Sequence, residues 1–109
     1  MKLKLWVDDV RPAPKGYIWC KSVNQAIVRI KYCDFMNNRM NLEGHYSVTI
    51  IDIDHDAGDY AYDGGDYIKL LDWLEETGRN YPIRIHSMNP VGVANMRAII
   101  ERNGWTEVK

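Results

Sequence analysis

Short apolar runs that are typical of buried strands alternate along this chain with segments of helical periodicity. The runs occupy residues 3–7, 17–20, 48–53 and 82–85. The third run is rich in β-branched residues and nearly continuous in hydrophobicity, as expected of a central strand that is covered on both faces. The alternation predicts one α/β domain over residues 1–109, with a mostly parallel sheet in three layers.

Three segments have the spacing and the end signals of helices. Ser22 followed by Gln25 forms a capping box, and apolar residues continue at helical spacing as far as Cys33. A second helix is expected over residues 67–74, and a third begins at Asn89-Pro90 and ends near residues 103–104. The remaining segments, residues 11–16, 34–45 and 105–108, are expected to form a proline-rich loop, an irregular connector and a final edge strand.

Charge and cysteine content narrow the class of protein. Lys and Arg total 14 while Asp and Glu total 15, so no overall field favours an extended nucleic-acid surface or an anionic membrane. No apolar run approaches the roughly 18 residues that a membrane span needs. Cys20 and Cys33 form no metal-binding motif and are expected to be reduced core thiols, which predicts a soluble, cytoplasmic protein. The sequence makes no prediction of oligomeric state.

Polar residues follow three of the predicted strands at the point where each strand ends. They are Asp8-Asp9 after the first run, the group Asp52, Asp54, His55 and Asp56 at the end of the third, and His86-Ser87 after the fourth. In open α/β sheets, ligands bind outside the carboxyl ends of the strands. The three groups are therefore expected to converge on one functional site.

Aspartate is concentrated in the segment that follows the third run. Residues 52–66 contain six aspartates and no Lys or Arg. Carboxylates held close together repel one another unless a cation intervenes, and Mg²⁺ and Mn²⁺ prefer carboxylate oxygen. Because of their positions at strand ends, the candidate metal ligands are Asp8, Asp9, Asp54 and Asp56. Asp59 and Asp63 are better explained as caps of turns or of a helix N-terminus.

The third polar group lies just before the N-terminus of a predicted helix, where free backbone N–H groups favour an anion such as phosphate. Ser87, Asn89 and Gly92 fit a phosphate cradle. Arg11 is placed to clamp a phosphate, although it fits a surface arginine in a turn equally well.

Two histidines are candidates for proton transfer. His86 has the chemistry to protonate a leaving oxygen or to help hold a metal, or else to serve only as a core residue. His55 lies among acids and is biased toward its charged form, which suits either proton transfer or a simple ion pair.

Three motifs together resemble the cyclic-phosphate-processing receiver-like domains, which are relatives of response-regulator receivers. The motifs are LWVDDVRPAP, IDIDHDAG and IHSMNPVGVANM, and the resemblance spans nearly the whole chain. It implies a minimal flavodoxin-like, receiver-like fold with a shortened first helix and no final helix, and hydrolysis or other processing of cyclic phosphates. The matching positions are Asp8, Asp9 and Arg11 in the first motif, Asp54, His55 and Asp56 in the second, and His86, Ser87 and Asn89 in the third.

The wider resemblance to receivers matches Asp8-Asp9 to a metal-binding acid pair, Asp54 to the phosphoacceptor and Ser87 to the switch hydroxyl. The lysine that receivers need after their last strand has no match, because Lys109 is the last residue. Phosphoacceptor signalling at Asp54 is therefore one of two alternatives, and a non-catalytic adaptor or binding domain is the other.

The leading hypothesis is metal-dependent hydrolysis of a cyclic phosphate on a nucleotide or an RNA end. Asp8, Asp9 and Asp54 would hold Mg²⁺ or Mn²⁺. His86, with His55 as its substitute, would protonate the leaving oxygen.

Overall fold

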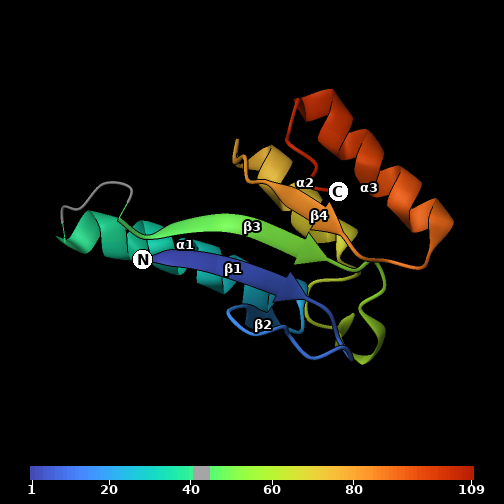
Figure 1. Cartoon of the computed structure of the whole chain (residues 1–109), viewed down its shortest axis with the longest axis horizontal. Coiled ribbons are helices and arrows are strands. Elements are labelled where there is room, and N and C mark those ends of the chain that lie inside the picture. Colours follow the sequence, from blue (N-terminus) through green and yellow to red (C-terminus); the bar gives the residue numbers. More distant parts are fainter. Residues whose placement is uncertain (41–44) are drawn as a thin grey trace.

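The computed structural model describes residues 1–40 and 45–109, which form a parallel sheet and three helices (Figure 1). All four strands are parallel and lie in the order β2-β1-β3-β4. The elements are β1 (Lys2–Val7), β2 (Ile18–Cys20), α1 (Val23–Met40), β3 (Ser47–Ile53), the 3₁₀ turn η1 (Gly58–Tyr60), α2 (Ile68–Glu76), β4 (Ile83–Ile85) and α3 (Pro90–Asn103). The parallel, receiver-like α/β fold that the sequence predicts is thus confirmed.

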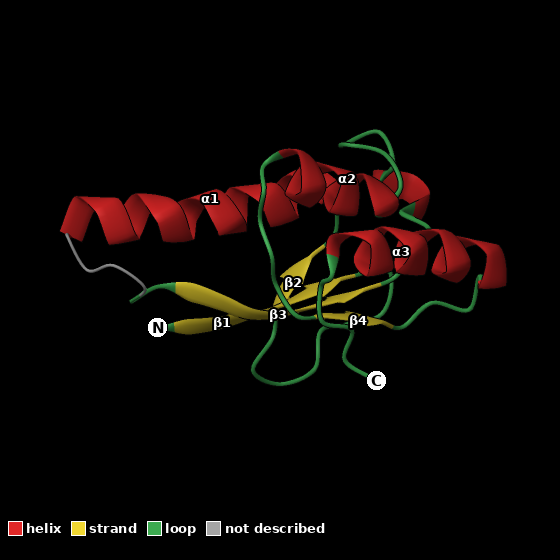
Figure 2. Ribbon diagram, turned by 90° about the horizontal axis from the view of Figure 1, so that it is seen from above, coloured by secondary structure: helices red, strands yellow, loops and turns green. Residues whose placement is uncertain are grey.

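The helices cover one face of the sheet. Figure 2 shows α1, α2 and α3 on the same side of the strands. Along β1, Leu3 and Leu5 point under the helices and are buried, whereas Lys2 and Lys4 are exposed. The second helical layer of the expected three-layer arrangement is therefore reduced to the loop between β1 and β2, because two prolines keep residues 11–16 from forming a helix.

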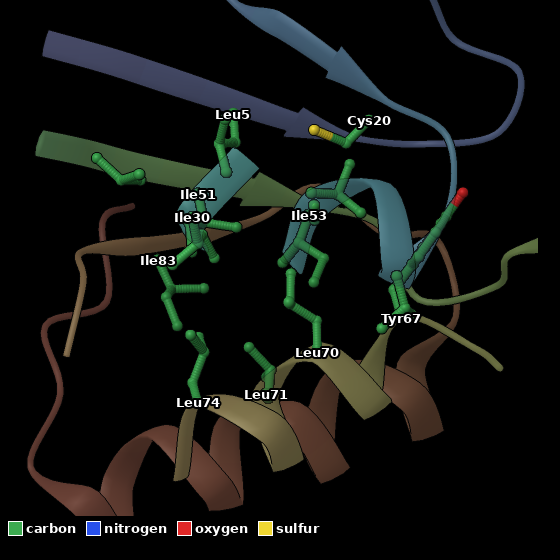
Figure 3. Packing of buried hydrophobic residues seen from close by; sticks show 14 of the residues in the cluster. Leu5, Cys20, Ile30, Ile51, Ile53, Tyr67, Leu70, Leu71, Leu74 and Ile83 are labelled. Atoms are coloured by element: carbon green, nitrogen blue, oxygen red, sulfur yellow. The ribbon is translucent and has the colours of Figure 1, made fainter. Parts of the chain in front are cut away.

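The core lies between the sheet and the helices (Figure 3). Ile51 and Ile53 of β3 are fully buried, as are Leu70 and Leu74 of α2. Each such side chain contributes about 1.5–3 kcal/mol of transfer free energy when it leaves water. Tyr67, also fully buried, donates a hydrogen bond of 2.7 Å from its hydroxyl to the carbonyl of Lys21. This packing fixes the strand ends that carry the polar residues.

The first helix is longer than the sequence predicts. It continues through Met40, so most of the expected connector over residues 34–45 is helical, while residues 41–44 lie outside the described part of the chain. Asn37 explains the extension. Its side-chain amide donates to the carbonyl of Tyr46 at 2.8 Å and accepts from the N–H of the same residue at 2.7 Å. The asparagine therefore ties the helix to the start of β3 and does not mark a loop.

The last helix and the chain after it agree with the sequence. Asn89 caps α3 by accepting from the N–H of Gly92 at 3.0 Å, and Gly104 ends the helix with a φ of 67°. The tail then lies along β4, where Ile83 and Glu107 form one parallel bridge. The expected final edge strand is thus shortened to a single bridge. Cys20 and Cys33 are free and buried, as expected.

Candidate metal and phosphate site

The strand register brings three polar residues together. Val7 of β1 pairs with Ile53 of β3, and Ile53 pairs with Ile85 of β4. The next residues along the three strands are Asp8, Asp54 and His86, and one ligand atom from each lies within 4.8 Å of the others. The convergence expected at the carboxyl edge of the sheet is therefore present in the structure.

Asp8 is fully buried and accepts three hydrogen bonds. Its Oδ1 accepts from the backbone N–H groups of Val10 and Arg11, both at 2.9 Å, and its Oδ2 lies 2.8 Å from Nε2 of His86. Burial on its own would raise the pKa of this carboxyl, but the two backbone donors and His86 outweigh burial and lower it. Asp8 is therefore held as a carboxylate.

His86 is held between two carboxylates. Its Nδ1 lies 2.6 Å from Oδ1 of Asp52, its Nε2 faces Asp8, and its ring stacks on Trp6 with centroids 3.9 Å apart. Burial would lower the pKa of His86, but the hydrogen bonds to Asp52 and Asp8 raise it. The imidazolium form is favoured, with both nitrogens donating. We call Asp8, Asp52 and His86 the His86 network.

Asp52 belongs to the predicted acidic group, but the sequence predicted no ligand or catalytic role for it. It is 2% exposed, and its second oxygen accepts from Nη1 of Arg84 at 3.0 Å. The signal in the sequence was an acid inside an otherwise apolar strand, because a buried carboxylate must be paired. The partner, His86, is 34 residues away along the chain and is supplied only by the pairing of β3 with β4.

Beside the His86 network lies an open pocket of about 250 Å³, which we call the acidic hollow. Its lining comprises Arg11, Asp54, Asp56, Ser87, Met88 and Asn89. Arg11 donates from Nη1 to the carbonyl of His86 at 3.0 Å, which fixes its guanidinium at the rim. The predicted phosphate-binding residues Arg11, Ser87 and Asn89 thus line one pocket with Asp54.

The predicted cradle residue Gly92 has a different environment. Its N–H is taken by the cap of Asn89, and its Cα faces the ring of His55 so closely that a Cβ would overlap the ring. His55 in turn lies 2.8 Å from Oδ1 of Asp56 through Nδ1. Gly92 therefore allows the close approach of His55 to α3.

The remaining acids have separate environments. Asp9 packs against Gly58, whose φ of 54° and lack of a Cβ make room for the carboxylate. Neither Asp9 nor Asp56 belongs to the close group of Asp8, Asp54 and His86. Asp63 accepts from the Ser22 hydroxyl at 2.6 Å, so it helps to cap α1, in agreement with the sequence prediction.

The donor atoms fit a divalent cation. Two carboxylates and one imidazole suit Mn²⁺ and, with more waters, Mg²⁺. Asp52 contacts the ring nitrogen of His86 that lies away from Asp8, which is the arrangement that orients metal-binding histidines in proteins. Asp8, Asp54 and His86 would hold such an ion, and His86 would bind it through a ring nitrogen that carries no proton.

Comparison with known proteins bears on the whole domain. No curated protein and no solved structure shows a significant match to the chain. Among the described residues, no helix has both the length and the apolar character to cross a membrane. A family model described as the cyclic-phosphate processing receiver domain matches residues 3–102. The chain therefore belongs to the family of cyclic-phosphate processing receiver domains.

Proposed function

We propose that this domain is a metal-dependent hydrolase of a cyclic phosphate on a nucleotide or an RNA end. One observation carries the proposal. The candidate ion ligands Asp8, Asp54 and His86 lie next to a pocket that is lined by an arginine, a serine hydroxyl and an asparagine amide. Such a pocket matches a phosphate diester beside a cation. Two free, buried thiols suit a reducing compartment, so we place the reaction in the cytoplasm.

The ion would be held by Asp8, Asp54 and His86. When bound, Mg²⁺ or Mn²⁺ supplies an acidified water and offsets negative charge on the phosphate. Asp52 keeps His86 oriented through Nδ1, and Arg84 neutralises the outer oxygen of Asp52. Asp9 and Asp56, which we expected to be ligands, lie farther from this group and would support it through charge alone.

The phosphate oxygens would be held at the rim of the acidic hollow. Arg11 presents a guanidinium that is anchored by one nitrogen, so its other donors remain for an anion. Ser87 presents a hydroxyl whose oxygen accepts from the N–H of Asn89 at 3.1 Å, and the hydroxyl proton can then point toward the ligand. The amide nitrogen of Asn89, 3.4 Å from Asp56, supplies a further donor.

The proton for the leaving oxygen would come from His55. His86 would be a ligand of the ion, its other nitrogen contacts Asp52 and its side chain is only 7% exposed, so it is poorly placed to release a proton to substrate. His55 contacts Asp56 and Asn89 through Nδ1, and both of these residues line the hollow. The role that the sequence gave first to His86 is thus transferred to its substitute.

The test is turnover of 2′,3′-cyclic and 3′,5′-cyclic nucleotides, and of RNA ending in a 2′,3′-cyclic phosphate, with Mn²⁺ or Mg²⁺. We expect turnover by the wild type, loss in Asp54→Asn, and full activity in Asp59→Asn, which changes an exposed aspartate outside the pocket. His55→Gln should lower kcat more than KM. An inactive wild type across this panel, or an active Asp54→Asn variant, would sink the proposal.

A phosphoacceptor role at Asp54 has less support. No lysine lines the acidic hollow in the described part of the chain, and Lys109 lies 3.2 Å from Glu107 in the tail. Among the described residues, the acidic hollow therefore lacks the lysine that would contact a phosphoryl group on Asp54. A stable adduct on Asp54 after treatment with acetyl phosphate would reverse this preference.

A binding role without catalysis is favoured by one observation. The His86 network is complete in charge and hydrogen bonds without an ion, since each nitrogen of His86 meets a carboxylate. An adaptor would keep that network closed when Mn²⁺ is added. Unchanged His86 ring resonances in an NMR titration with MnCl₂ would favour the adaptor over the hydrolase.

A further inference from the structure

A larger hollow lies between the edge strand β2 and the first turns of α1. It measures about 540 Å³, and its lining includes Trp19 of β2 together with Val28, Arg29 and Tyr32 of α1. None of these four residues lines the acidic hollow. We call this feature the β2–α1 groove, and the proposed hydrolysis gives it no role.

One wall of the groove is a strand edge. In the described chain β2 pairs with one neighbour only, β1. The carbonyl of Cys20 points toward β1, because it accepts from the N–H of Asp8 at 3.2 Å. Backbone groups alternate in direction along a strand, so the N–H and C=O of Trp19 point outward. An outward pair of this kind can hydrogen-bond to an extended chain laid beside it.

The opposite wall carries exposed apolar side chains at helical spacing. Val28 is 64% exposed and Tyr32 44%, and Phe35, 57% exposed, continues the same helical spacing beyond the residues that line the groove. Residues at this spacing share one face of a helix. These fractions are high for large apolar residues in a chain that has buried most of the others, so the face is suited to contact with alternate side chains of an added strand.

Within the part of the chain that the structure describes, the groove contains one cation, Arg29, and one acid, Asp63. Arg29 forms no ion pair among the described residues, whereas four other arginines each contact a carboxylate, namely Arg79, Arg84, Arg97 and Arg102. Outside the lining of the groove, Lys21 adds a second cation, with its Nζ 4.5 Å from the centre of the Trp19 ring. The acid of the groove, Asp63, already accepts hydrogen bonds from Ser22 and Asn24. Arg29 is therefore the charged group of the groove that is left to contact a ligand, and a carboxylate is its complement.

We propose that the β2–α1 groove binds an extended acidic segment of a partner protein, which adds as a strand next to β2. The backbone of the segment would pair with Trp19. Its apolar side chains would contact Val28 and Tyr32, and a carboxylate would pair with Arg29. This role goes beyond the proposed hydrolysis, because none of these residues contributes to the acidic site.

The test uses a capped peptide of alternating Glu and Val as the probe, followed by ¹H–¹⁵N NMR of the full chain. We expect saturable shifts of the Trp19 and Arg29 amides. A peptide of alternating Lys and Val has the same strand propensity and the opposite charge, and it should not bind. The Glu-Val peptide with N-methyl groups on alternate residues keeps its charge but loses backbone donors, and it should not bind either.

Two variants complete the experiment. Arg29→Glu should weaken binding of the Glu-Val peptide about tenfold, because it removes the cation and places a like charge against the carboxylates of the peptide. Arg39→Glu makes the same change on the last turn of the same helix and should bind like the wild type. Equal binding by the two variants, or by the N-methylated peptide, would overturn the proposal. Self-association that Arg29→Glu abolishes would overturn it as well, because the occupant would then be a second copy.

Discussion

The His86 network and the acidic hollow lie side by side and each contain two aspartates, yet the aspartates have different surroundings. In the network, Asp8 and Asp52 are almost fully buried, and both direct an oxygen at His86. In the hollow, Asp54 and Asp56 face an open pocket beside Arg11. Burial thus directs Asp8 and Asp52 at His86, whereas Asp54 and Asp56 line a pocket that a ligand can enter.

Removing a carboxylate from the network should have the largest effect. Asp52→Ala leaves the buried imidazolium with one partner, so we expect a loss of about 3 kcal/mol in the free energy of unfolding, the lower end of the range for breaking a buried ion pair. Urea unfolding near pH 6 measures it. Asp59→Ala, on the exposed turn η1, should stay within about 0.5 kcal/mol of the wild type. Equal costs for the two variants would show that the network does not stabilise the fold.

The matching change in the hollow should alter binding and leave stability intact. Asp54→Asn removes a proposed ligand at a partly exposed position, and we expect unfolding within about 0.5 kcal/mol of the wild type. Affinity for Mn²⁺ should fall about 100-fold, because even residues that only orient metal ligands contribute roughly 10–100-fold. Calorimetric titration with MnCl₂ measures the change. If Asp54→Asn unfolds as easily as Asp52→Ala, the two regions are not distinct.

The boundary between the two regions and α3 can be tested at Gly92. A Cβ there would overlap the His55 ring, so Gly92→Ala should cost about 1–3 kcal/mol of stability, the range for overpacking. The double variant with His55→Ala should recover most of this loss, because the ring that clashes is gone. Thermal unfolding of the two single variants and the double variant forms the cycle. An unrecovered loss would place the strain in the helix backbone instead.

Most of the fold follows from local patterns in the sequence. Short-range periodicity and end signals predict the strand that ends at Ile53 and the helix that Asn89 caps. The alternation of strands and helices predicts that the strands are parallel. All three features appear in the structure. The end of α1 was wrong because Asn37, which favours loops locally, is bound by the backbone of Tyr46. A contact with the next strand thus overrides local propensity.

The position of the candidate site could be predicted from the sequence, but the contacts between its side chains could not. Strand ends place Asp8, Asp54 and His86 at one edge, and the pairing register brings them together. The pairing of Asp52 with His86 could not be predicted, since it requires knowing which face of β3 lacks a helix. The predicted cap at Asn89 already implied that the N–H of Gly92, the third helical residue, is used inside the protein, because an N-cap side chain accepts from the second or third N–H of its helix.

The smallest expected effect comes from removing the proton of His86, because a neutral ring still donates one hydrogen bond. The pKa of His86 is raised above its ordinary value of 6.5, so its contribution to stability is complete below that pH and is lost as pH rises through the raised pKa. The pKa of Asp8 is lowered from 3.8, so its contribution is present above that value and is lost as pH falls through the lower pKa. The His86 network therefore contributes most to the free energy of unfolding between about pH 3.8 and pH 6.5.

We expect the free energy of unfolding to decrease as pH is raised from about 6 into the alkaline range, as the imidazolium loses its proton. His86→Gln should be less stable near pH 6 and should lose this slope. His55→Gln changes a histidine beside the acidic hollow and should keep it, because the slope belongs to the network. Urea unfolding at a series of pH values gives all three profiles. If the pH dependence of the free energy of unfolding remains in His86→Gln, it belongs to another titrating group. The His86 network and the acidic hollow would then not differ in their contribution to the pH dependence of stability.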